Sequence, residues 1–516
     1  CAQVIQYAEN TTTSECQAFP TPCDVPTGWK PVTECSLSAP AKVLTTQFQV
    51  QKFASCDDLE SRLLEITKRY QSRYWYPYPI MYADELLRKM LLRTDIECFT
   101  KDDSECLSTS LSEAPVSTTN TQVLGVDEAD TVKTDGKYLY SYSEESHEVR
   151  IVRMSDLTLA KSIKLPDTFS SMQMYLSGDR LIIVGSKYTD TNSSWNYRWY
   201  APEIKTIALV YRVKDPSAPV LERYHQIDGS YRDSRVIGDT LYFVSSNDLR
   251  MPPVYMTQYG KDENDFETLT DVEKNFTIKN LVPDIRESLI GTNGRYKQSV
   301  RSAIASCKDI TFVLPTSSTL TNTDFTPALV SLSSLKITDP TAKMQSELVF
   351  GDVSQIYMSK NALYLTSTIS LETETARRAC PPNAKCFAPS TQTQSQTLVH
   401  KYTLSAGKLS YQYSTTVMGN PMSQYSMDED ANGNFRIVTQ NYAWSSGQSE
   451  NSTELSIISP SGKVIGKLTG IQNEKISNQA DLSEIDYLVT FQQIDPLFVI
   501  DVANPKSPKI LGELKI

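Results

Sequence analysis

Short runs in which apolar and polar residues alternate dominate the chain from about residue 120 onward. A turn of small residues followed by an alternating strand recurs, as in "DGKYLYSYS", "IGDTLYFVS" and "SKNALYLTS". Alternating side chains point to opposite faces of a β-sheet, and the turn residues let a hairpin reverse. The pattern therefore predicts an all-β fold built from hairpins.

A second hairpin follows each of the first kind. In "VYRVKDPSAPVLERY" and "VIDVANPKSPKILGEL" an Asp-Pro or Asn-Pro turn joins two strands. Two hairpins per repeat make a four-stranded sheet, and about six such repeats predict a β-propeller of four-stranded blades. The third repeat is interrupted by a long insertion around residues 248–308, and loops of that size often carry function.

The first part of the chain has a different pattern. In "SCDDLESRLLEITKRY", Leu59, Leu63 and Ile66 stand at helical spacing behind Ser55, a candidate N-cap. "ADELLRKMLLR" predicts a second short helix. We therefore expect a small, disulfide-stapled helical region over residues 1–115, followed by the propeller over residues 116–516.

The cysteines favour disulfides over a metal. Seven of the ten lie in the first 106 residues, no C-x-x-C pair occurs, and the chain has three histidines, so a zinc site is poorly supported. Disulfides indicate an oxidising compartment and an extracellular or cell-surface protein. "CPPNAKC" predicts a loop closed by a Cys380–Cys386 bond, and we expect Cys307 to bond to an N-terminal cysteine.

Cys1 has two interpretations. A cysteine at a mature N-terminus is typical of a lipoprotein, and a lipid on its thiol would attach the protein to a membrane. Alternatively Cys1 is one half of a disulfide, because the total of ten cysteines is even.

Composition and charge narrow the partners. An apolar content of 40% and a charged content of 22% are ordinary for a folded domain. A net charge of −11 argues against nucleic acid, whose phosphates need a basic surface. We expect the partner to be a protein or a glycan at the cell surface.

Three carboxylates, Asp127, Glu128 and Asp130, lie close together in "VLGVDEADTVKTDG". We expect them at an inner strand, facing the propeller channel or its mouth. Clustered carboxylates suit a hard cation or a substrate, but they also cap turns and pair with a nearby Lys or Arg. Both interpretations stay open at this point.

The loop "DEDANGN" is the strongest metal candidate. Asp428, Asp430 and Asn432 stand at alternate positions around Gly433, with Asn434 as a further oxygen ligand, and this spacing is typical of calcium loops. However, Arg436 stands where such loops usually supply a late carboxylate. The alternative is an Asn-Gly hairpin turn with solvated acids, and the missing ligand favours it. We therefore expect either no cofactor or a bound calcium ion.

Several of these segments resemble one protein family. "TNTQVLGVDEADTVKTDGKYLYSYS" and "VTFQQIDPLFVIDVANPKSPKILGELKI" are similar to parts of a family of secreted bacterial and archaeal proteins with a C-terminal β-propeller domain. The resemblance implies a propeller and secretion, and it implies no activity. Because such proteins usually continue past "LGELKI", we expect seven or eight blades in the complete protein, or terminal blades that meet another subunit.

Two functions remain. The chain has no G-x-S-x-G, H-E-x-x-H, P-loop or G-x-G-x-x-G motif, so no catalytic residue can be assigned. This favours a non-catalytic binding or assembly scaffold at the cell surface. The alternative is a secreted, glycosidase-like hydrolase that uses channel carboxylates, with calcium as a stabilising ion. A channel filled by its own side chains would favour the scaffold.

Overall fold

The structure is a computed structural model with two compact units, residues 1–46 and 47–516. Before residue 63 it describes residues 6–10, 16–19, 23, 25–32, 48–51, 55 and 57–62. From there on it describes residues 121–188, 204–248, 284–290, 296–303, 312–315, 323–324, 328–339, 341–373, 392–445, 448–471, 476–479, 487–492 and 497–514.

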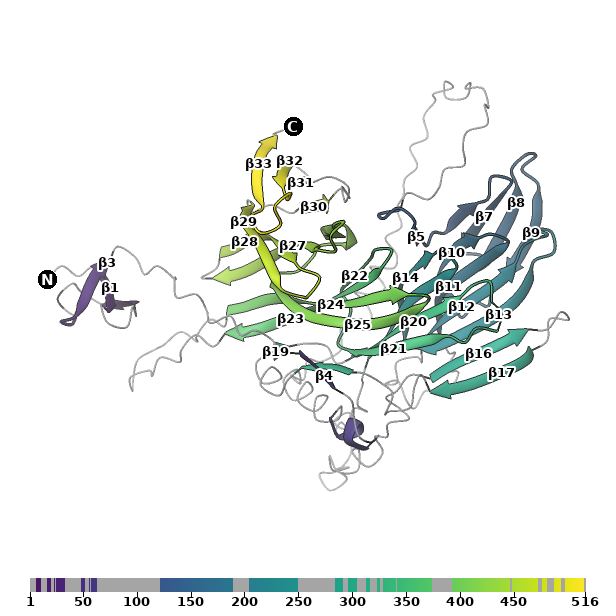
Figure 1. The fold of residues 1–516 in the computed structure, drawn as a ribbon, viewed down its shortest axis with the longest axis horizontal. Coiled ribbons are helices and arrows are strands. Elements are labelled where there is room, and N and C mark those ends of the chain that lie inside the picture. Colours follow the sequence, from purple (N-terminus) through teal and green to yellow (C-terminus); the bar gives the residue numbers. More distant parts are fainter. Residues whose placement is uncertain are drawn as a thin grey trace, which may run out of the picture. The chain divides into compact units, whose positions relative to one another are not determined.

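Among the residues described, the second unit holds six antiparallel sheets that are each built on four strands, and one separate two-stranded sheet (Figure 1). In five of the six the four strands follow one another along the chain, and in the third the long insertion interrupts them. The first sheet consists of β6 (Val132–Thr134), β7 (Tyr138–Ser143), β8 (Glu148–Arg153) and β9 (Leu159–Lys164). The second sheet begins with β10 (Phe169–Ser177), β11 (Arg180–Tyr188), β12 (Ile204–Arg212) and β13 (Val220–Asp228). The third sheet contains β14 (Ser230–Ile237), β15 (Thr240–Asp248), β20 (Ala328–Lys336) and β21 (Gln345–Phe350).

The last three sheets repeat the plan. The fourth sheet consists of β22 (Gln355–Met358), β23 (Ala362–Thr373), β24 (Gln392–Ser405) and β25 (Lys408–Met418). The fifth consists of β26 (Met427–Glu429), β27 (Phe435–Ser445), β28 (Gln448–Ile458) and β29 (Val464–Ile471). The sixth consists of β30 (Ile476–Gln479), β31 (Tyr487–Gln492), β32 (Leu497–Asp501) and β33 (Lys509–Leu514). The predicted four-stranded repeat is confirmed.

The Asp-Pro and Asn-Pro turns join the last two strands of the second, third and sixth sheets. In each turn the Asp or Asn side-chain oxygen accepts a bond from the backbone N–H two residues on. Asp215 accepts from Ser217 at 3.0 Å, Asp339 accepts from Thr341 at 2.8 Å, and Asn504 accepts from Lys506 at 3.1 Å. The same residue types therefore produce the same turn in three sheets.

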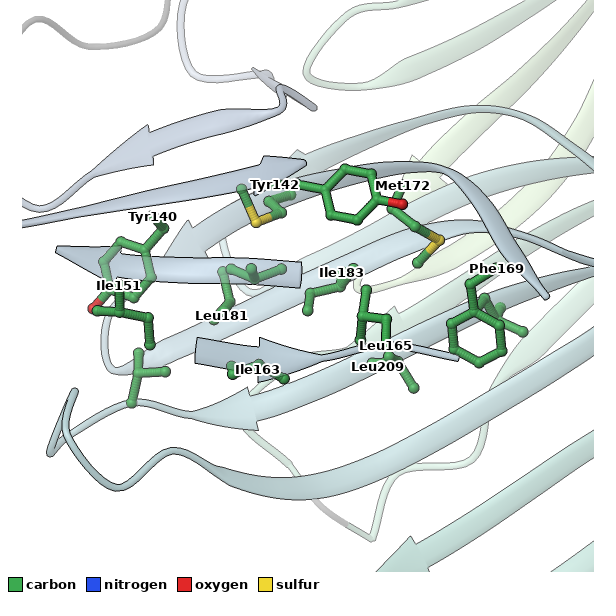
Figure 2. Packing of buried hydrophobic residues seen from close by; sticks show 14 residues of the cluster. Tyr140, Tyr142, Ile151, Ile163, Leu165, Phe169, Met172, Leu181, Ile183 and Leu209 are labelled. Carbon is green, nitrogen blue, oxygen red and sulfur yellow. The ribbon is translucent and has the colours of Figure 1, made fainter. Parts of the chain in front are cut away.

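The sheets pack face to face in chain order, and the alternation of the sequence supports this. In β11, Leu181 and Ile183 pack against the first sheet, whereas Ile182 and Val184 pack against the third. Figure 2 shows the first of these layers, with Ile151 of β8 among the side chains from the first sheet. Similar apolar layers join the third to the fourth, the fourth to the fifth and the fifth to the sixth sheet. A strand buried on both faces must be apolar at consecutive positions, which explains "RLIIVG".

The long insertion lies between β15 and β20 and contributes strands to neighbouring sheets. Its hairpin, β16 (Asp284–Ile290) and β17 (Tyr296–Ala303), pairs through β16 with β13 and extends the second sheet to six strands. Its strand β19 (Thr323–Asp324) pairs with β23. Another strand, β18 (Phe312–Pro315), pairs with β4 (Phe48–Gln51). The described insertion strands therefore join sheets that start elsewhere in the chain.

The N-terminal region contains strands that the sequence analysis did not predict. The first unit has a three-stranded sheet of β2 (Cys16–Phe19), β1 (Gln6–Asn10) and β3 (Trp29–Val32). Each of these strands has only four or five residues, which is too few for a clear alternation of apolar and polar positions. In the second unit residues 57–62 are helical, and the Ser55 hydroxyl accepts from the Asp58 N–H at 3.1 Å, as expected of an N-cap. The second predicted helix lies outside the described residues. Among those described, no helix is long and apolar enough to cross a membrane.

Candidate functional site

The segment before the first sheet, residues 121–130, runs along the first strands of other sheets; we call it the crossing segment. Its strand β5 (Asp127–Glu128) pairs with β14 of the third sheet. Asp130 forms a two-residue bridge with Met174 in β10 of the second sheet. The Gln122 side chain donates to the backbone oxygens of Gln424 at 3.1 Å and Met427 at 2.9 Å, where the fifth sheet begins. One segment thus connects three sheets through their first strands.

Two of the predicted channel carboxylates pair with buried cations. Asp127 Oδ1 lies 2.9 Å from Lys133 Nζ, which also donates to the backbone oxygen of Glu128 at 2.6 Å. Glu128 Oε1 accepts from the Gln122 N–H at 3.2 Å and lies 3.8 Å from Arg235 Nε. Both carboxylates therefore contact groups of this chain: Asp127 pairs with Lys133, and Glu128 contacts Gln122 of the crossing segment and Arg235 of β14.

Asp130, the third predicted carboxylate, does not join this pair. Its Oδ1 accepts from the backbone N–H groups of Thr131 at 2.7 Å and Val132 at 3.4 Å. These bonds hold the turn that leads from the crossing segment into β6. The structure therefore places Asp127 and Glu128 together, and gives Asp130 a local contact to the turn.

Arg235 is the centre of the buried network and is only 5% exposed. Its Nη1 donates to Asp233 Oδ1 at 2.6 Å and its Nη2 donates to Gln424 Oε1 at 2.7 Å. Burial by itself would lower the pKa of Arg235, but the Asp233 carboxylate, with a smaller contribution from Glu128, outweighs it and raises that pKa. The guanidinium therefore stays charged and joins the third sheet to the fifth.

Two tyrosines complete the network. The phenol oxygens of Tyr175 and Tyr231 each lie 2.7 Å from Ser234 Oγ, and Lys133 Nζ lies 5.5 Å from the centre of the Tyr175 ring. Burial raises the pKa of both phenols, so they remain protonated at neutral pH. The network thus contains donors and acceptors that satisfy one another, and its carboxylates already have cationic partners.

Lys133 and Arg235 were not predicted from the sequence, and the structure shows why Lys133 was hard to find. In "DTVKTDG" the apolar residue Val132 is 44% exposed and its charged neighbour Lys133 is 7% exposed, the reverse of what hydrophobicity predicts. A charge at the inward position of a strand normally requires a partner inside. Lys133 contacts Asp127 and the backbone of Glu128, six and five residues upstream, although Asp130 and Asp135 lie closer to it in sequence.

The predicted calcium loop is a hairpin turn between β26 and β27. Asp430 Oδ1 accepts from the backbone N–H groups of Asn432 at 2.9 Å and Asn434 at 2.8 Å, and its Oδ2 accepts from Asn434 Nδ2 at 2.8 Å. Gly433 has φ +77°, the left-handed conformation that the turn needs. The side chains of Asp430 and Asn434 therefore bind each other, and Asn432 donates its backbone N–H to Asp430.

Asp428, the fourth predicted ligand, is 1% exposed and forms a two-bond ion pair with Arg436. Its Oδ1 lies 2.7 Å from Arg436 Nε and its Oδ2 lies 2.5 Å from Arg436 Nη2. In the described part of the chain, no group of three or more His, Cys, Asp or Glu side chains is arranged to hold a metal ion. Calcium binding at this loop stays a prediction, and Arg436 would compete with the ion for the carboxylate of Asp428.

We expect that millimolar calcium leaves the melting temperature of the parent protein unchanged, since Arg436 already holds both oxygens of Asp428. The Asp430→Ala variant should lose about 1 kcal/mol of stability, because the turn loses three acceptor contacts at a partly solvated site. Thermal unfolding with calcium and with a chelator tests both statements. A rise in the parent that Asp430→Ala abolishes would establish the calcium loop instead.

A half-buried carboxylate, Glu429, joins the fourth and fifth sheets and was not predicted. Its Oε1 accepts from Tyr364 Oη at 2.5 Å and lies 2.9 Å from Lys401 Nζ, and its Oε2 accepts from the Ser359 hydroxyl. The Tyr364 ring stacks on Phe435 with centroids 3.9 Å apart. Burial and the neighbouring Glu429 raise the pKa of the Tyr364 phenol, which therefore acts as a hydrogen-bond donor.

The structure does not describe the cysteines of the predicted disulfides and lipid anchor. Cys1, Cys307, Cys380 and Cys386 all lie outside the described residues, so the anchor and these bonds stay predictions. Cys23, in the first unit, is disulfide-bonded.

Comparison with known sequences identifies the family. Residues 116–516 match the family described as Beta propeller domain, which is more than half of the chain. The chain belongs to this β-propeller domain family. The six four-stranded sheets are therefore propeller blades, and the predicted fold class is confirmed.

Relatives of this β-propeller occur in archaea. An uncharacterized protein of Methanocaldococcus jannaschii is 26% identical over 426 residues, which cover 80% of this chain and 64% of the relative. An uncharacterized protein of Archaeoglobus fulgidus is 24% identical over 438 residues, which cover 78% of this chain and 64% of the relative. The chain thus spans less than two thirds of the length of either relative.

Among solved structures, this β-propeller is similar to Hsv2 of Kluyveromyces lactis at 8% sequence identity and a TM-score of 0.25, over 75% of this chain and 99% of that chain. A similarity this low has no bearing on function.

Proposed function

We propose that this β-propeller is an exported protein that acts at the cell surface as a non-catalytic binding or assembly scaffold. The observation that carries the proposal is the network around the crossing segment. Asp127 and Glu128, the carboxylates that the sequence placed at the channel, are paired with Lys133 and Arg235. The segment that holds them links three blades.

This geometry argues against the hydrolase alternative at these residues. A glycosidase needs two carboxyl groups that face the sugar, one of them protonated to serve as the acid. Here both carboxylates lie beside cations and bond to backbone groups or side chains of their own chain. Such contacts engage both carboxylates inside the chain, and we infer that their role is to join blades.

The partner that we propose is a protein or a glycan of the cell envelope. The apolar layers between consecutive blades give a rigid framework, and rigid frameworks commonly present their binding residues on loops. Attachment through a lipid on Cys1 and contacts of the terminal blades with another subunit belong to the same proposal.

Sedimentation of the purified chain with cell envelopes, followed by chemical analysis of the bound material, tests the proposal. We expect saturable binding, recovery of the partner intact, and no release of reducing sugar from envelope glycans. The Glu128→Gln variant should bind as the parent does once both are folded. Release of sugar that Glu128→Gln abolishes would support the hydrolase instead, and absence of envelope binding would refute the scaffold.

A further inference from the structure

A cavity of about 480 Å³ opens beside the second blade, where the insertion hairpin extends the sheet. We call it the blade-2 groove. The side chains that matter for its chemistry are those of Phe169, Lys187, Tyr224, Gln226, Arg286 and Ser288. They come from four strands of one sheet, so the groove is built on a rigid element.

The groove follows from the unequal size of two neighbouring blades. On β11 and β12, Ile183 and Leu209 face the first blade and pack against it. In the pairing of the strands, Leu209 stands opposite Tyr224, and Tyr224 stands opposite Ser288 on β16. The same face of the sheet therefore continues from the apolar layer onto β13 and β16.

The described first blade has four strands and the second has six, so the added strands extend beyond their neighbour. Gln226 and Arg286 stand opposite each other on this extension, beside the pair formed by Tyr224 and Ser288. The insertion hairpin thus creates a polar ledge at the edge of an apolar layer, and the cavity lies over it.

The charged side chains among the described lining residues of the groove are both basic. Lys187 and Arg286 line the groove, and none of the described side chains that line it is a carboxylate, although the net charge of the chain is −11. Alternation on β16 sends Glu287 to the opposite face, where its carboxylate lies 3.5 Å from His225 Nδ1 and accepts from the Met344 N–H at 2.8 Å. Glu287, the acid next to Arg286 in sequence, therefore lies on the face towards the third blade and does not line the groove.

Two residues of the groove offer donors to a ligand. Tyr224 Oη donates to Gln226 Oε1 at 2.9 Å, which orients that amide and leaves its Nε2 as a donor. Arg286 is exposed and has no ion-pair partner among the described residues. The Arg286 guanidinium, with the Gln226 amide donor on the strand beside it, matches the oxygens of a carboxylate or a phosphate.

We propose that the blade-2 groove binds an organic anion about the size of one or two sugar rings, with its carboxylate or phosphate group at Arg286. The inference deepens the proposed binding function and rests on it. The volume falls within the range of about 300–1,000 Å³ that is typical of small-molecule sites. The amide of Gln226 bonds the uncharged part of the ligand, and Phe169 adds an apolar side chain to the lining.

Calorimetric titration of the folded chain tests the proposal with four probes: D-glucuronate, glucose 6-phosphate, D-glucose and inorganic phosphate. We expect binding of at least one sugar anion, weaker binding of inorganic phosphate and none of D-glucose. The Arg286→Gln variant should bind that sugar anion about tenfold to a hundredfold more weakly, as expected for loss of a charged hydrogen-bond pair. The arms with glucuronate and glucose 6-phosphate tell a carboxylate site from a phosphate site.

Arg150→Gln is the matched control, because Arg150 is an exposed arginine on β8 of the first blade and lies outside the groove. It should bind the sugar anion as the parent does, and both variants should keep the parent's melting temperature. Failure of both sugar anions to bind, equal binding by Arg286→Gln, or equal binding of D-glucose would each overturn the proposal. Inorganic phosphate that binds as tightly as the sugar anions would overturn the assignment of an organic ligand.

The outcome is separable from that of the scaffold proposal. Envelope sedimentation that fails while glucuronate or glucose 6-phosphate still titrates would refute the scaffold and leave the groove in place. Envelope binding that persists without any titratable anion would refute the groove and leave the scaffold.

Discussion

Replacing Arg436 by methionine is expected to lower the free energy of unfolding by about 3–5 kcal/mol, the usual cost of removing one partner from a buried ion pair. Arg436 is 3% exposed and Asp428 is 1% exposed, and two short bonds join them. Without the guanidinium, the carboxylate of Asp428 would be left in the core without its cation. Chemical denaturation of the parent and the variant measures the difference.

The double variant Asp428→Asn/Arg436→Met should recover part of the loss, because it no longer buries an unpaired charge. Lys467→Met provides a matched control at an exposed pair, where Lys467 Nζ lies 2.7 Å from Glu454 Oε1 and the lysine side chain is 47% exposed. That control should cost less than about 1 kcal/mol. A loss below 1 kcal/mol in Arg436→Met would show that the buried pair contributes little.

Acidification from pH 7 to pH 5 is expected to remove about 2 kcal/mol of stability through His400 alone. Burial lowers the pKa of His400 to about 3, against a usual value of about 6.5 in an unfolded chain. Between these two values the unfolded chain binds a proton that the folded protein does not. The contribution is therefore complete above the unfolded pKa and is lost, by about 1.4 kcal/mol per pH unit, as the pH falls below it.

Denaturation midpoints of the parent and of His400→Gln at pH 7, 6 and 5 test this expectation. The variant should be less stable at pH 7, because it loses the contact between His400 Nδ1 and Ser414 Oγ, 2.6 Å apart in the core. Its loss of stability on acidification should be smaller, because its unfolding takes up about one proton fewer. Burial also lowers the pKa of His225, so that histidine should keep its own contribution in the variant. Parallel pH profiles for the two proteins would contradict the assignment.

The sequence determined the blades because their signals are local. Alternation depends on residues two apart, and a turn depends on three or four consecutive residues. "DPSAP" and "NPKSP" therefore specify their hairpins without reference to the rest of the chain. The same local rule found Ser55 at the start of a helix. It also drew attention to Asp127, Glu128 and the loop after Asp428, since clustered carboxylates are visible in any sequence.

Only the tertiary structure decided what those carboxylates do. Glu128 lies beside Arg235 because β5 pairs with β14, more than a hundred residues later, and no local pattern specifies that pairing. The insertion is similar: Arg286 reaches the blade-2 groove because β16 pairs with β13 of an earlier blade. Local sequence predicts the strands of the blades. Which edges they join, and therefore which charges meet, depends on how a whole sheet packs against its neighbours.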